Sequence, residues 1–262
     1  MTFRAYFSSS ASHITRFTRG VRSAWPHVMH AILPNACALC GNLSHSTLCP
    51  FCDESYWNES ALRCCVCAVL PLTFTRREQH ASYRCADCVV EAPPFDATFA
   101  LADYRAPLDA LAVGLKFRAQ LMLAREFARR LARLAQDTWQ DPSDCPDVIA
   151  PVPLADRRLR ERGYNQAWQI ARALARSLKV PGDPTLVRRV IDTAPQSRLD
   201  LDARRLNVGR AFQLAGKVEG LHVGIVDDVM TTGATLEALA RTLKAAGARR
   251  VTNFVALRTP KN

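Results

Sequence analysis

The sequence has no apolar run that approaches the ~20 consecutive residues a membrane-spanning helix needs. It contains no credible secretory signal, and no acidic residue precedes Asp53. We therefore expect no membrane span and a cytoplasmic location. Core-forming residues are not scarce, since 48% of the 262 residues are hydrophobic, and this excludes a disordered protein.

The first 33 residues form a basic N-terminal segment. Residues 1–25 contain Ser, Arg, His and aromatic residues, a composition that resembles a transit peptide. Because nothing else in the sequence suggests an organelle, we favour a disordered tail or an over-long start. A short helix is expected at about 25–33, packing against the segment that follows.

The formal net charge is +11, and its distribution along the chain is uneven. Residues 1–95 carry 8 Lys or Arg against 6 Asp or Glu, whereas residues 96–262 carry 27 against 18. The basic surplus therefore lies in the C-terminal part, where phosphates, other polyanions or nucleic acid are plausible partners. The alternative is that many of these arginines only cover solvated helix faces.

Nine of the ten cysteines lie between positions 37 and 88, and eight of them form four C-x-x-C pairs. Two thiolates at this spacing grip one side of a tetrahedral metal, and two such pairs complete a zinc site without an open position. We therefore predict a cysteine module over residues 34–92 that holds two structural Zn²⁺ ions. The predicted ligands are Cys37, Cys40, Cys49 and Cys52 for one ion, and Cys64, Cys67, Cys85 and Cys88 for the other.

Alternatives for the cysteines stay open. Spacing alone does not exclude a crossed pairing of the four C-x-x-C units, and Cys65 could replace Cys64. A redox dithiol is less favoured because four pairs share one small module, and a secreted disulfide scaffold rarely uses only C-x-x-C pairs. His45 and His80 could replace a ligand, although each site already has four sulfurs.

After the stiff connection "EAPPF" (91–95), buried strands alternate with amphipathic helices. Such an alternation favours an α/β fold with a mostly parallel sheet and helices on both faces, here over residues 96–262. A segment rich in Pro, Asp and Arg, 179–215, is expected to form a loop or hairpin beside the sheet. The expected strands are 96–104, 147–154, 222–228 and 251–257, and the expected helices are 107–117, 121–136, 165–178 and 234–247.

One stretch, "VGIVDDVMTTGATLEAL" (223–239), joins an expected strand to an expected helix. Ligands of open parallel sheets bind at the carboxyl ends of strands, and a helix N-terminus offers unpaired N–H groups and partial positive charge. The stretch lacks the G-x-x-x-x-G-K-[ST] pattern, so it predicts a cradle for a single phosphate rather than a P-loop. A glycine in this cradle lets the backbone approach the ligand closely. The cradle residues would be Thr231, Thr232, Gly233, Ala234 and Thr235.

Two acidic residues, Asp227 and Asp228, stand beside this cradle, and they cannot serve the phosphate because they would repel it. Carboxylates instead suit groups that donate hydrogen bonds, such as neighbouring sugar hydroxyls. An acidic pair next to a phosphate cradle therefore predicts a phosphorylated ribose as the ligand. The alternative is a surface turn between a strand and a capped helix.

The stretch "VGIVDDVMTTGAT" resembles the phosphoribosyl pyrophosphate (PRPP) motif of type I phosphoribosyltransferases. This resemblance implies that Asp227 and Asp228 bind the ribose hydroxyls and that the T-T-G-x-T loop binds the 5-phosphate. Together with the cysteine pairs, three further stretches resemble the ComF/GntX (competence protein F-like) family. That resemblance covers roughly residues 33–258 and implies a type I phosphoribosyltransferase fold preceded by a double zinc ribbon. The three stretches are "GLKF" (114–117), "APVPLADRRLRERGYNQA" (150–167) and "APQSRLDLDARRLNVGRAF" (194–212).

The family fold also implies a pyrophosphate loop after the strand "VIAPV". Arginine can grip phosphate oxygens bidentately, and Mg²⁺ commonly bridges such oxygens. We single out Arg157 and Arg162 as pyrophosphate-binding residues, with Lys116 as a weaker third; the alternative is a solvated helix face. Segment 179–215 would be the hood that closes over the substrate and excludes water. Its inward-facing residues would be Gln196, Arg204 and Asn207.

Two functions from different classes remain open. The first is a phosphoribosyltransferase that uses PRPP and Mg²⁺ to ribosylate a base or another nucleophile, mainly by positioning and electrostatics. Against it, we find no clear base-recognition segment between 236 and 262. The second, implied by the family's role in natural competence, is a non-catalytic accessory protein of DNA uptake that binds single-stranded DNA or a helicase. Against it, the cysteine module is nearly neutral and has few aromatic residues.

Overall fold

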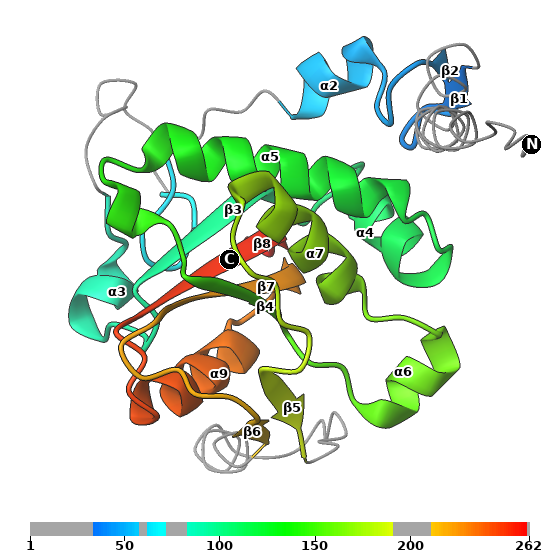
Figure 1. Cartoon of the computed structure of the whole chain (residues 1–262). Coiled ribbons are helices and arrows are strands. Elements are labelled where there is room, and N and C mark those ends of the chain that lie inside the picture. Colours follow the sequence, from blue (N-terminus) through cyan, green and yellow to red (C-terminus); the bar gives the residue numbers. More distant parts are fainter. Residues whose placement is uncertain (1–33, 58–61, 72–82, 191–210, 261–262) are drawn as a thin grey trace, which may run out of the picture. The chain divides into compact units, whose positions relative to one another are not determined.

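The computed structural model describes residues 34–57, 62–71, 83–190 and 211–260 (Figure 1). Contacts along the chain divide it into two compact units, Met1–Asp53 and Glu54–Asn262. The domain limits expected from the sequence stay a prediction. Several expected features lie outside the described residues: the helix at 25–33, His80, Gln196, Arg204 and Asn207.

The described part of the first unit is built around its cysteines. β1 (Asn35–Ala36) pairs antiparallel with β2 (Leu43–Ser44), and α2 (Pro50–Tyr56) begins in this unit. Between the two strands the chain turns tightly, because the Gly41 N–H donates to the Cys37 carbonyl at 2.9 Å. This turn folds the first C-x-x-C pair into a knuckle, the shape that brings two sulfurs to one side of a metal.

The second unit is built on a four-stranded sheet with strand order β3-β8-β7-β4, in which all neighbouring pairs are parallel. Because the strands all run the same way, their carboxyl ends lie at one edge of the sheet (Figure 1). These strands confirm the four that the sequence predicted. They are β3 (Ala97–Asp103), β4 (Val148–Pro151), β7 (His222–Met230) and β8 (Arg250–Arg258).

Helices cover both faces of this sheet, as the sequence predicted. α5 (Met122–Thr138) and α7 (Gln166–Leu178) pack side by side on one face, and α9 (Ala234–Ala245) covers the other (Figure 1). α4 (Asp109–Phe117) precedes α5 and packs against it. The apolar spacing along α5 places Leu123 and Phe127 at 0% exposure. No helix in the described part of the chain is both long and apolar enough to cross a membrane.

Two segments beside the sheet bear on the site. The arginine-rich stretch after β4 forms a seven-residue helix, α6 (Asp156–Arg162), where the family resemblance implied a loop. α6 ends at Gly163, whose φ of +78° gives the left-handed turn that commonly stops a helix. β5 (Val187–Arg189) and β6 (Phe212–Leu214) pair antiparallel, which confirms hairpin pairing between the flanks of the expected hood.

The second cysteine segment is part of the core of the second unit. Cys64, Cys67, Cys85 and Cys88 belong to the same buried cluster as Leu236, Leu239 and Leu243 of α9 and several strand residues. The Cys65 carbonyl also accepts a hydrogen bond from the Thr98 N–H of β3 at 3.3 Å. α3 (Ala86–Val90) follows within this segment. The segment therefore shares one face of the sheet with α9.

His222, the first residue of β7, is fully buried. Its backbone N–H donates to Asp147 Oδ2 (2.7 Å), and its Nε2 lies 2.8 Å from Thr252 Oγ1. Burial, assisted by the positive charges of Arg250 and Arg249, lowers the pKa of His222 from 6.5 to about 4. The native protein therefore keeps this imidazole neutral at pH values where the unfolded chain protonates it.

We expect the free energy of unfolding to fall as the pH drops from about 6.5 to about 4, by up to roughly 3 kcal/mol. The unfolded chain binds a proton in this range that the folded chain does not. The pKa values of Asp144 and Asp147 are lowered from 3.8, so the contribution of these carboxylates to the free energy of unfolding is lost only at more acidic pH. Urea unfolding of wild type and His222→Gln across this range measures the effect. Equal slopes of the free energy of unfolding against pH for the two proteins would refute it.

Candidate functional site

The acidic pair lies near the carboxyl end of β7, the strand between β8 and β4. Asp228 is 3% exposed, and its Oδ2 has no hydrogen-bond partner among the described residues. Asp227 is partly buried, and burial together with the Asp228 carboxylate raises the pKa of Asp227 well above 3.8. A buried acceptor of this kind is costly unless something donates to it, so Asp228 Oδ2 is suited to a hydroxyl donor from a ligand.

The Oδ1 atoms of the pair are used locally and hold it in place. Asp227 Oδ1 accepts the Asp228 N–H at 2.9 Å, and Asp228 Oδ1 accepts the Val229 N–H at 3.0 Å. Each carboxylate is thereby oriented by the backbone of the next residue. This arrangement fixes one oxygen of Asp228 and leaves the other as the acceptor described above.

One of the three expected cations reaches this pair. Lys116, in the last turn of α4, places its Nζ 3.8 Å from Asp228 Oδ2. The Lys116 side chain is 35% exposed, so solvent screens the ion pair and its contribution to stability is modest. The structure thus brings Lys116 to the acidic pair, while its role in ligand binding stays a prediction.

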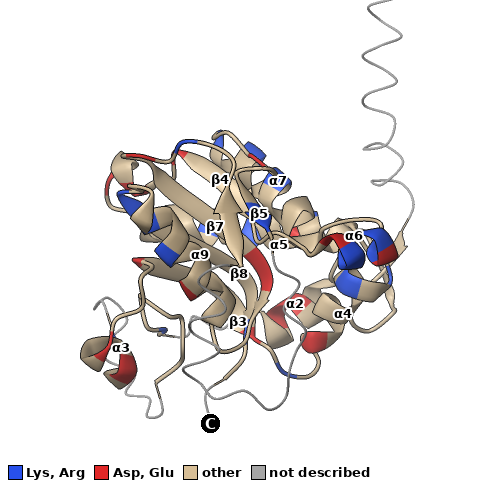
Figure 2. Ribbon diagram, turned by 90° about the horizontal axis from the view of Figure 1, so that it is seen from below, with Lys and Arg blue, Asp and Glu red and all other residues tan. Residues whose placement is uncertain are grey.

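The other two expected cations belong to α6, where Figure 2 shows basic residues gathered. Arg157 Nε pairs with Glu161 Oε1 at 2.8 Å on the exposed face of the helix, the local pairing that the solvated-face alternative predicts. Arg162 Nη1 donates to Gln166 Oε1 at 2.7 Å, and its guanidinium lies 5.3 Å from the centre of the Phe117 ring. Arg162 therefore lies beside the end of α4, whereas Arg157 forms a surface pair within α6.

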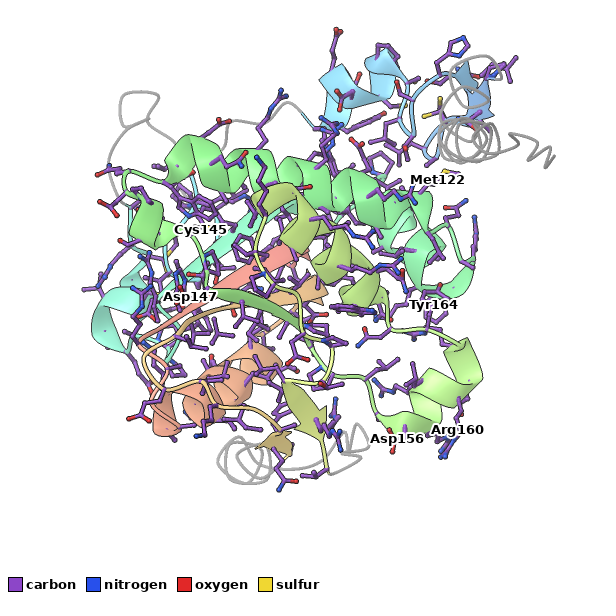
Figure 3. All side chains as sticks on the ribbon, viewed as in Figure 1. Met122, Cys145, Asp147, Asp156, Arg160 and Tyr164 are labelled. Atoms are coloured by element: carbon purple, nitrogen blue, oxygen red, sulfur yellow. The ribbon has the colours of Figure 1, made fainter. Side chains whose placement is uncertain are left out.

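The connection from α6 to α7 is fixed by two polar side chains, of which Tyr164 is labelled in Figure 3. The Tyr164 hydroxyl donates to the Leu115 carbonyl of α4. Asn165 caps α7, since its Oδ1 accepts the Trp168 N–H at 3.3 Å while its Nδ2 donates to the Val152 carbonyl at 3.0 Å. Capping accounts for Asn165, and Tyr164 holds the α6–α7 connection against the end of α4.

The phosphate loop, residues 229–235, runs from the end of β7 into α9. Thr231 and Thr232 are exposed, and Gly233 is the N-cap of α9 with a φ of +94°. A glycine N-cap has no side chain that could accept a hydrogen bond from the first helical N–H groups. The Ala234 N–H donates to Thr232 Oγ1 at 3.3 Å instead, and the other N–H groups of the first turn are suited to an anion. The loop therefore leads into a helix N-terminus, as the sequence predicted, and its binding of a phosphate stays a prediction.

A separate cavity of about 730 Å³ lies beside the segment that follows β4. Pro153, Trp168 and Arg188 are among its lining residues, which come from α6, α7 and the region of β5. The acidic pair and the phosphate loop do not line it. Most of its walls come from residues 151–169, which overlap the quoted stretch 150–167, and the rest come from residues 184–190 and Gln213.

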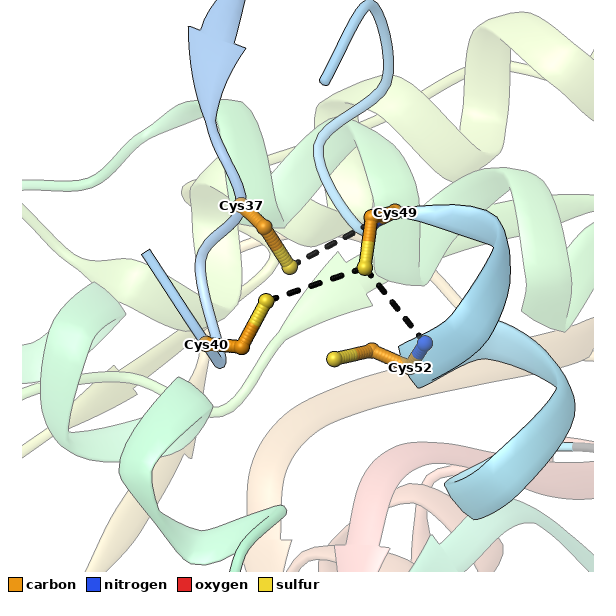
Figure 4. A group of neighbouring side chains, drawn as sticks. All are labelled: Cys37, Cys40, Cys49 and Cys52. Atoms are coloured by element: carbon orange, nitrogen blue, oxygen red, sulfur yellow. Dashed lines mark hydrogen bonds between the residues drawn. The ribbon is translucent and has the colours of Figure 1, made fainter. Parts of the chain in front are cut away.

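The first cysteine tetrad is formed by Cys37, Cys40, Cys49 and Cys52, whose sulfurs all lie within 4.8 Å of one another. Figure 4 shows these side chains pointing toward a common centre. Cys40 Sγ and Cys49 Sγ are 3.7 Å apart, and the Cys49 N–H points at Cys37 Sγ at 3.3 Å. N–H groups directed at sulfur favour the thiolate form that a metal requires.

The second cysteine tetrad consists of Cys64, Cys67, Cys85 and Cys88, with sulfurs again within 4.8 Å of one another and all four residues buried. Cys67 Sγ and Cys85 Sγ are 3.5 Å apart. A hydrogen bond from Cys67, followed by backbone N–H groups, lowers the pKa of Cys64 to about 4. The grouping is the sequential one rather than the crossed one, and Cys65 is exposed outside both tetrads.

Replacing Gly233 by alanine is expected to destabilise the protein by about 1–2 kcal/mol, because a left-handed φ is strained in any residue with a Cβ. The added Cβ would also lie 2.7 Å from Met230 Cε. Gly220→Ala is the matched control, since Gly220 has a φ of +72° and nothing within 4 Å of the added atom. Urea unfolding should show a larger loss for Gly233→Ala, and an equal loss would mean that the Met230 contact costs nothing.

Residues 120–261 match the phosphoribosyl transferase domain family. DNA utilization protein YhgH of Salmonella typhimurium is 34% identical over 231 residues, covering 87% of this chain and 98% of that protein. Competence protein F of Haemophilus influenzae is 33% identical over 177 residues, covering 66% and 77% of the two chains. A purine phosphoribosyltransferase structure from Pyrococcus horikoshii Ot3 aligns with 51% of this chain and 81% of its own, at 19% identity and a TM-score of 0.31.

The domain match extends from α5 to the end of β8 and so contains the acidic pair and the phosphate loop. The match to the Salmonella protein reaches into the cysteine-rich part as well, since it covers 87% of the chain. The protein combines a type I phosphoribosyltransferase fold with two N-terminal groups of four cysteines that are consistent with zinc ribbons. On this evidence the chain belongs to the ComF family of competence-related proteins.

Proposed function

We propose that the chain binds PRPP, with the ribose hydroxyls on the acidic pair and the 5-phosphate in the phosphate loop. The observation that carries this proposal is the buried Asp228 Oδ2, an acceptor with no donor among the described residues. It stands at the end of the same strand that leads into the helix-terminal cradle. One strand thus offers an acceptor for hydroxyls and, a few residues later, donors for an anion.

The basic residues around the site divide by position. Lys116 lies beside Asp228, where it would contact an oxygen of the ligand as well as the carboxylate. Arg162 lies near the end of α4, where it would bind the pyrophosphate group of the ligand. To bind the pyrophosphate group, Arg157 would have to break its ion pair with Glu161. Breaking it costs little free energy because an exposed ion pair contributes little to stability.

Mg²⁺ fits this arrangement as a partner of PRPP rather than of the protein alone. The metal takes oxygen ligands and keeps several waters, so it is usually held through substrate phosphates and one or two carboxylates. Asp227 and Asp228 are the carboxylates available here. When bound, the ion would neutralise charge on the departing pyrophosphate, while the chain's own residues orient the ribose.

The reaction that follows from this ligand is transfer of the phosphoribosyl group to a nucleophile with release of pyrophosphate. Such a reaction depends on positioning and on electrostatic stabilisation of the leaving group. The alternative function is a non-catalytic role in DNA uptake, in which the chain contacts single-stranded DNA or a helicase. The net basic charge of residues 96–262 and the names of the competence-protein relatives favour this second candidate.

Isothermal titration with PRPP and Mg²⁺ should show binding to wild type. Asp228→Asn should weaken it at least tenfold, because a neutral amide accepts hydroxyl hydrogen bonds less strongly than a carboxylate does. Asp137→Asn, an exposed change on α5, should leave the affinity unchanged. Undetectable PRPP binding by folded wild type would refute the proposal, and salt-dependent binding of single-stranded DNA by that same protein would support the alternative.

We further propose that each cysteine tetrad holds one structural Zn²⁺ ion. Metal analysis should find two zinc ions per chain, since each closed set of four thiolates fills a tetrahedral coordination shell. Cys49→Ser and Cys88→Ser should each lower the count toward one, whereas Cys145→Ser, outside both tetrads, should leave it at two. A wild-type count below two would contradict the assignment.

A further inference from the structure

The side chain of Arg258, the last residue of β8, is 1% exposed, the largest among the fully buried side chains of the described chain. Burying a guanidinium is expensive unless its N–H groups find acceptors and its charge finds compensation. A long apolar side chain would satisfy the packing at this position at less cost. The contacts of Arg258 therefore need an explanation beyond filling space.

Arg258 joins two parts of the second unit that are distant in sequence. Its Nε donates to the carbonyl of Cys67 at 3.1 Å, within the second cysteine tetrad. Its Nη1 donates to the carbonyl of Met230 at 3.0 Å and also to the carbonyl of Thr231. One rigid, planar group thus contacts a metal-ligand residue on one side and the start of the phosphate loop on the other.

The contacts to the loop determine where its amides point. In a trans peptide the carbonyl oxygen and the next residue's N–H point in opposite directions. The Met230 carbonyl, which the Thr259 N–H also holds at 2.9 Å, orients the Thr231 N–H. The Thr231 carbonyl, held by Arg258, orients the Thr232 N–H. Both carbonyls turn toward Arg258, so both amides turn away from it.

Charged groups of both signs surround Arg258 on the side of the tetrad: Asp103 favours its charged form, and Arg63 disfavours it. Asp103, at the end of β3, is 4% exposed and pairs with Arg63 at 2.9 Å, and Arg63 also donates to the carbonyl of Ala68 within the cysteine segment. Four thiolates around a divalent ion carry a net negative charge close to Cys67. A metal in this tetrad would thus fix the Cys67 carbonyl and also favour a buried cation beside it.

We propose that Arg258 is a positioning residue that couples metal occupancy of the second tetrad to the conformation of the phosphate loop. The inference rests on the proposed PRPP site for its functional meaning, although the coupling itself exists without ligand. The first tetrad has no part in it, since Arg258 contacts the second tetrad alone among the cysteine groups in the described residues. The two tetrads of one chain therefore differ in their effect on the site.

The first test uses Arg258→Met, which keeps the apolar stem and removes the donors. Amide hydrogen exchange of residues 229–235, measured without PRPP, should accelerate at least tenfold, while the zinc count stays at two. PRPP affinity should fall by a similar factor, and Arg258→Lys should recover part of both losses because its ammonium can still donate to one carbonyl. Unchanged loop exchange in Arg258→Met would overturn the proposal.

Leu131→Ala separates positioning from general destabilisation. Leu131 is fully buried on α5, outside the cluster that contains the second tetrad, and its truncation lowers stability without touching the loop. Under conditions where both variants remain folded, loop exchange should be fast in Arg258→Met and close to wild type in Leu131→Ala. Equal acceleration in the two would show that Arg258 acts only through stability and would overturn the coupling.

A further experiment compares the two tetrads by removing one predicted metal ligand from each. Cys88→Ser should accelerate exchange in the phosphate loop, whereas Cys49→Ser, in the first tetrad, should not. Equal effects of the two changes would refute the coupling.

If wild type fails to bind PRPP but its loop still responds to Arg258→Met and Cys88→Ser, the coupling stands and the proposed function fails. If wild type binds PRPP but its loop responds to neither change, the proposed function stands and the coupling fails.

Discussion

The pairing of β7 between β8 and β4 is the interaction on which the rest of the site depends. Residues 222–226 of β7 are buried, so the register is set by packing on both faces of the sheet. A shift of one residue would move every side chain to the opposite face. The observed register places Asp228 next to Lys116 and aligns Met230 with Arg258, from where the chain turns directly into the phosphate loop.

This strand also explains why polar groups are buried in an otherwise apolar sheet. His222 at its start and Asp228 near its end are both almost inaccessible, and Arg258 lies beside its last residue. The cost of burial is met differently in each case. His222 is kept neutral, the Arg258 guanidinium donates to carbonyl groups, and Asp228 has one oxygen that accepts a hydrogen bond and one that has no donor among the described residues. Local rules of burial are most often broken at functional sites, and the unsatisfied oxygen is the one that we assign to the proposed ligand.

Much of this organisation could be predicted from the sequence, and particular residues show where prediction ended. Helical spacing identified the buried face of α5, and C-x-x-C spacing identified the four cysteine pairs, because these signals are local. The sequential grouping of these pairs into two tetrads was decided by the structure. α6 was expected as a loop because the family resemblance implied one, and a segment of six charged residues and one leucine carries little periodic signal. The expected last strand, 251–257, ended one residue before Arg258. The available sign of this residue was that a charged side chain directly follows an apolar run.

By itself the sequence determined which residues to propose for the site: the eight cysteines, the two aspartates, and the threonine- and glycine-rich loop. Their roles follow from residue type and short spacing, which act over a few positions of the chain. Only the tertiary structure decided that Lys116 rather than Arg157 meets the acidic pair, and that the second tetrad shares a core with α9. The contact from Arg258 to Cys67 spans 191 positions, and such a contact exists only after the sheet has closed. Strand order and register, set by burial of the whole sheet, convert a list of reactive residues into a site.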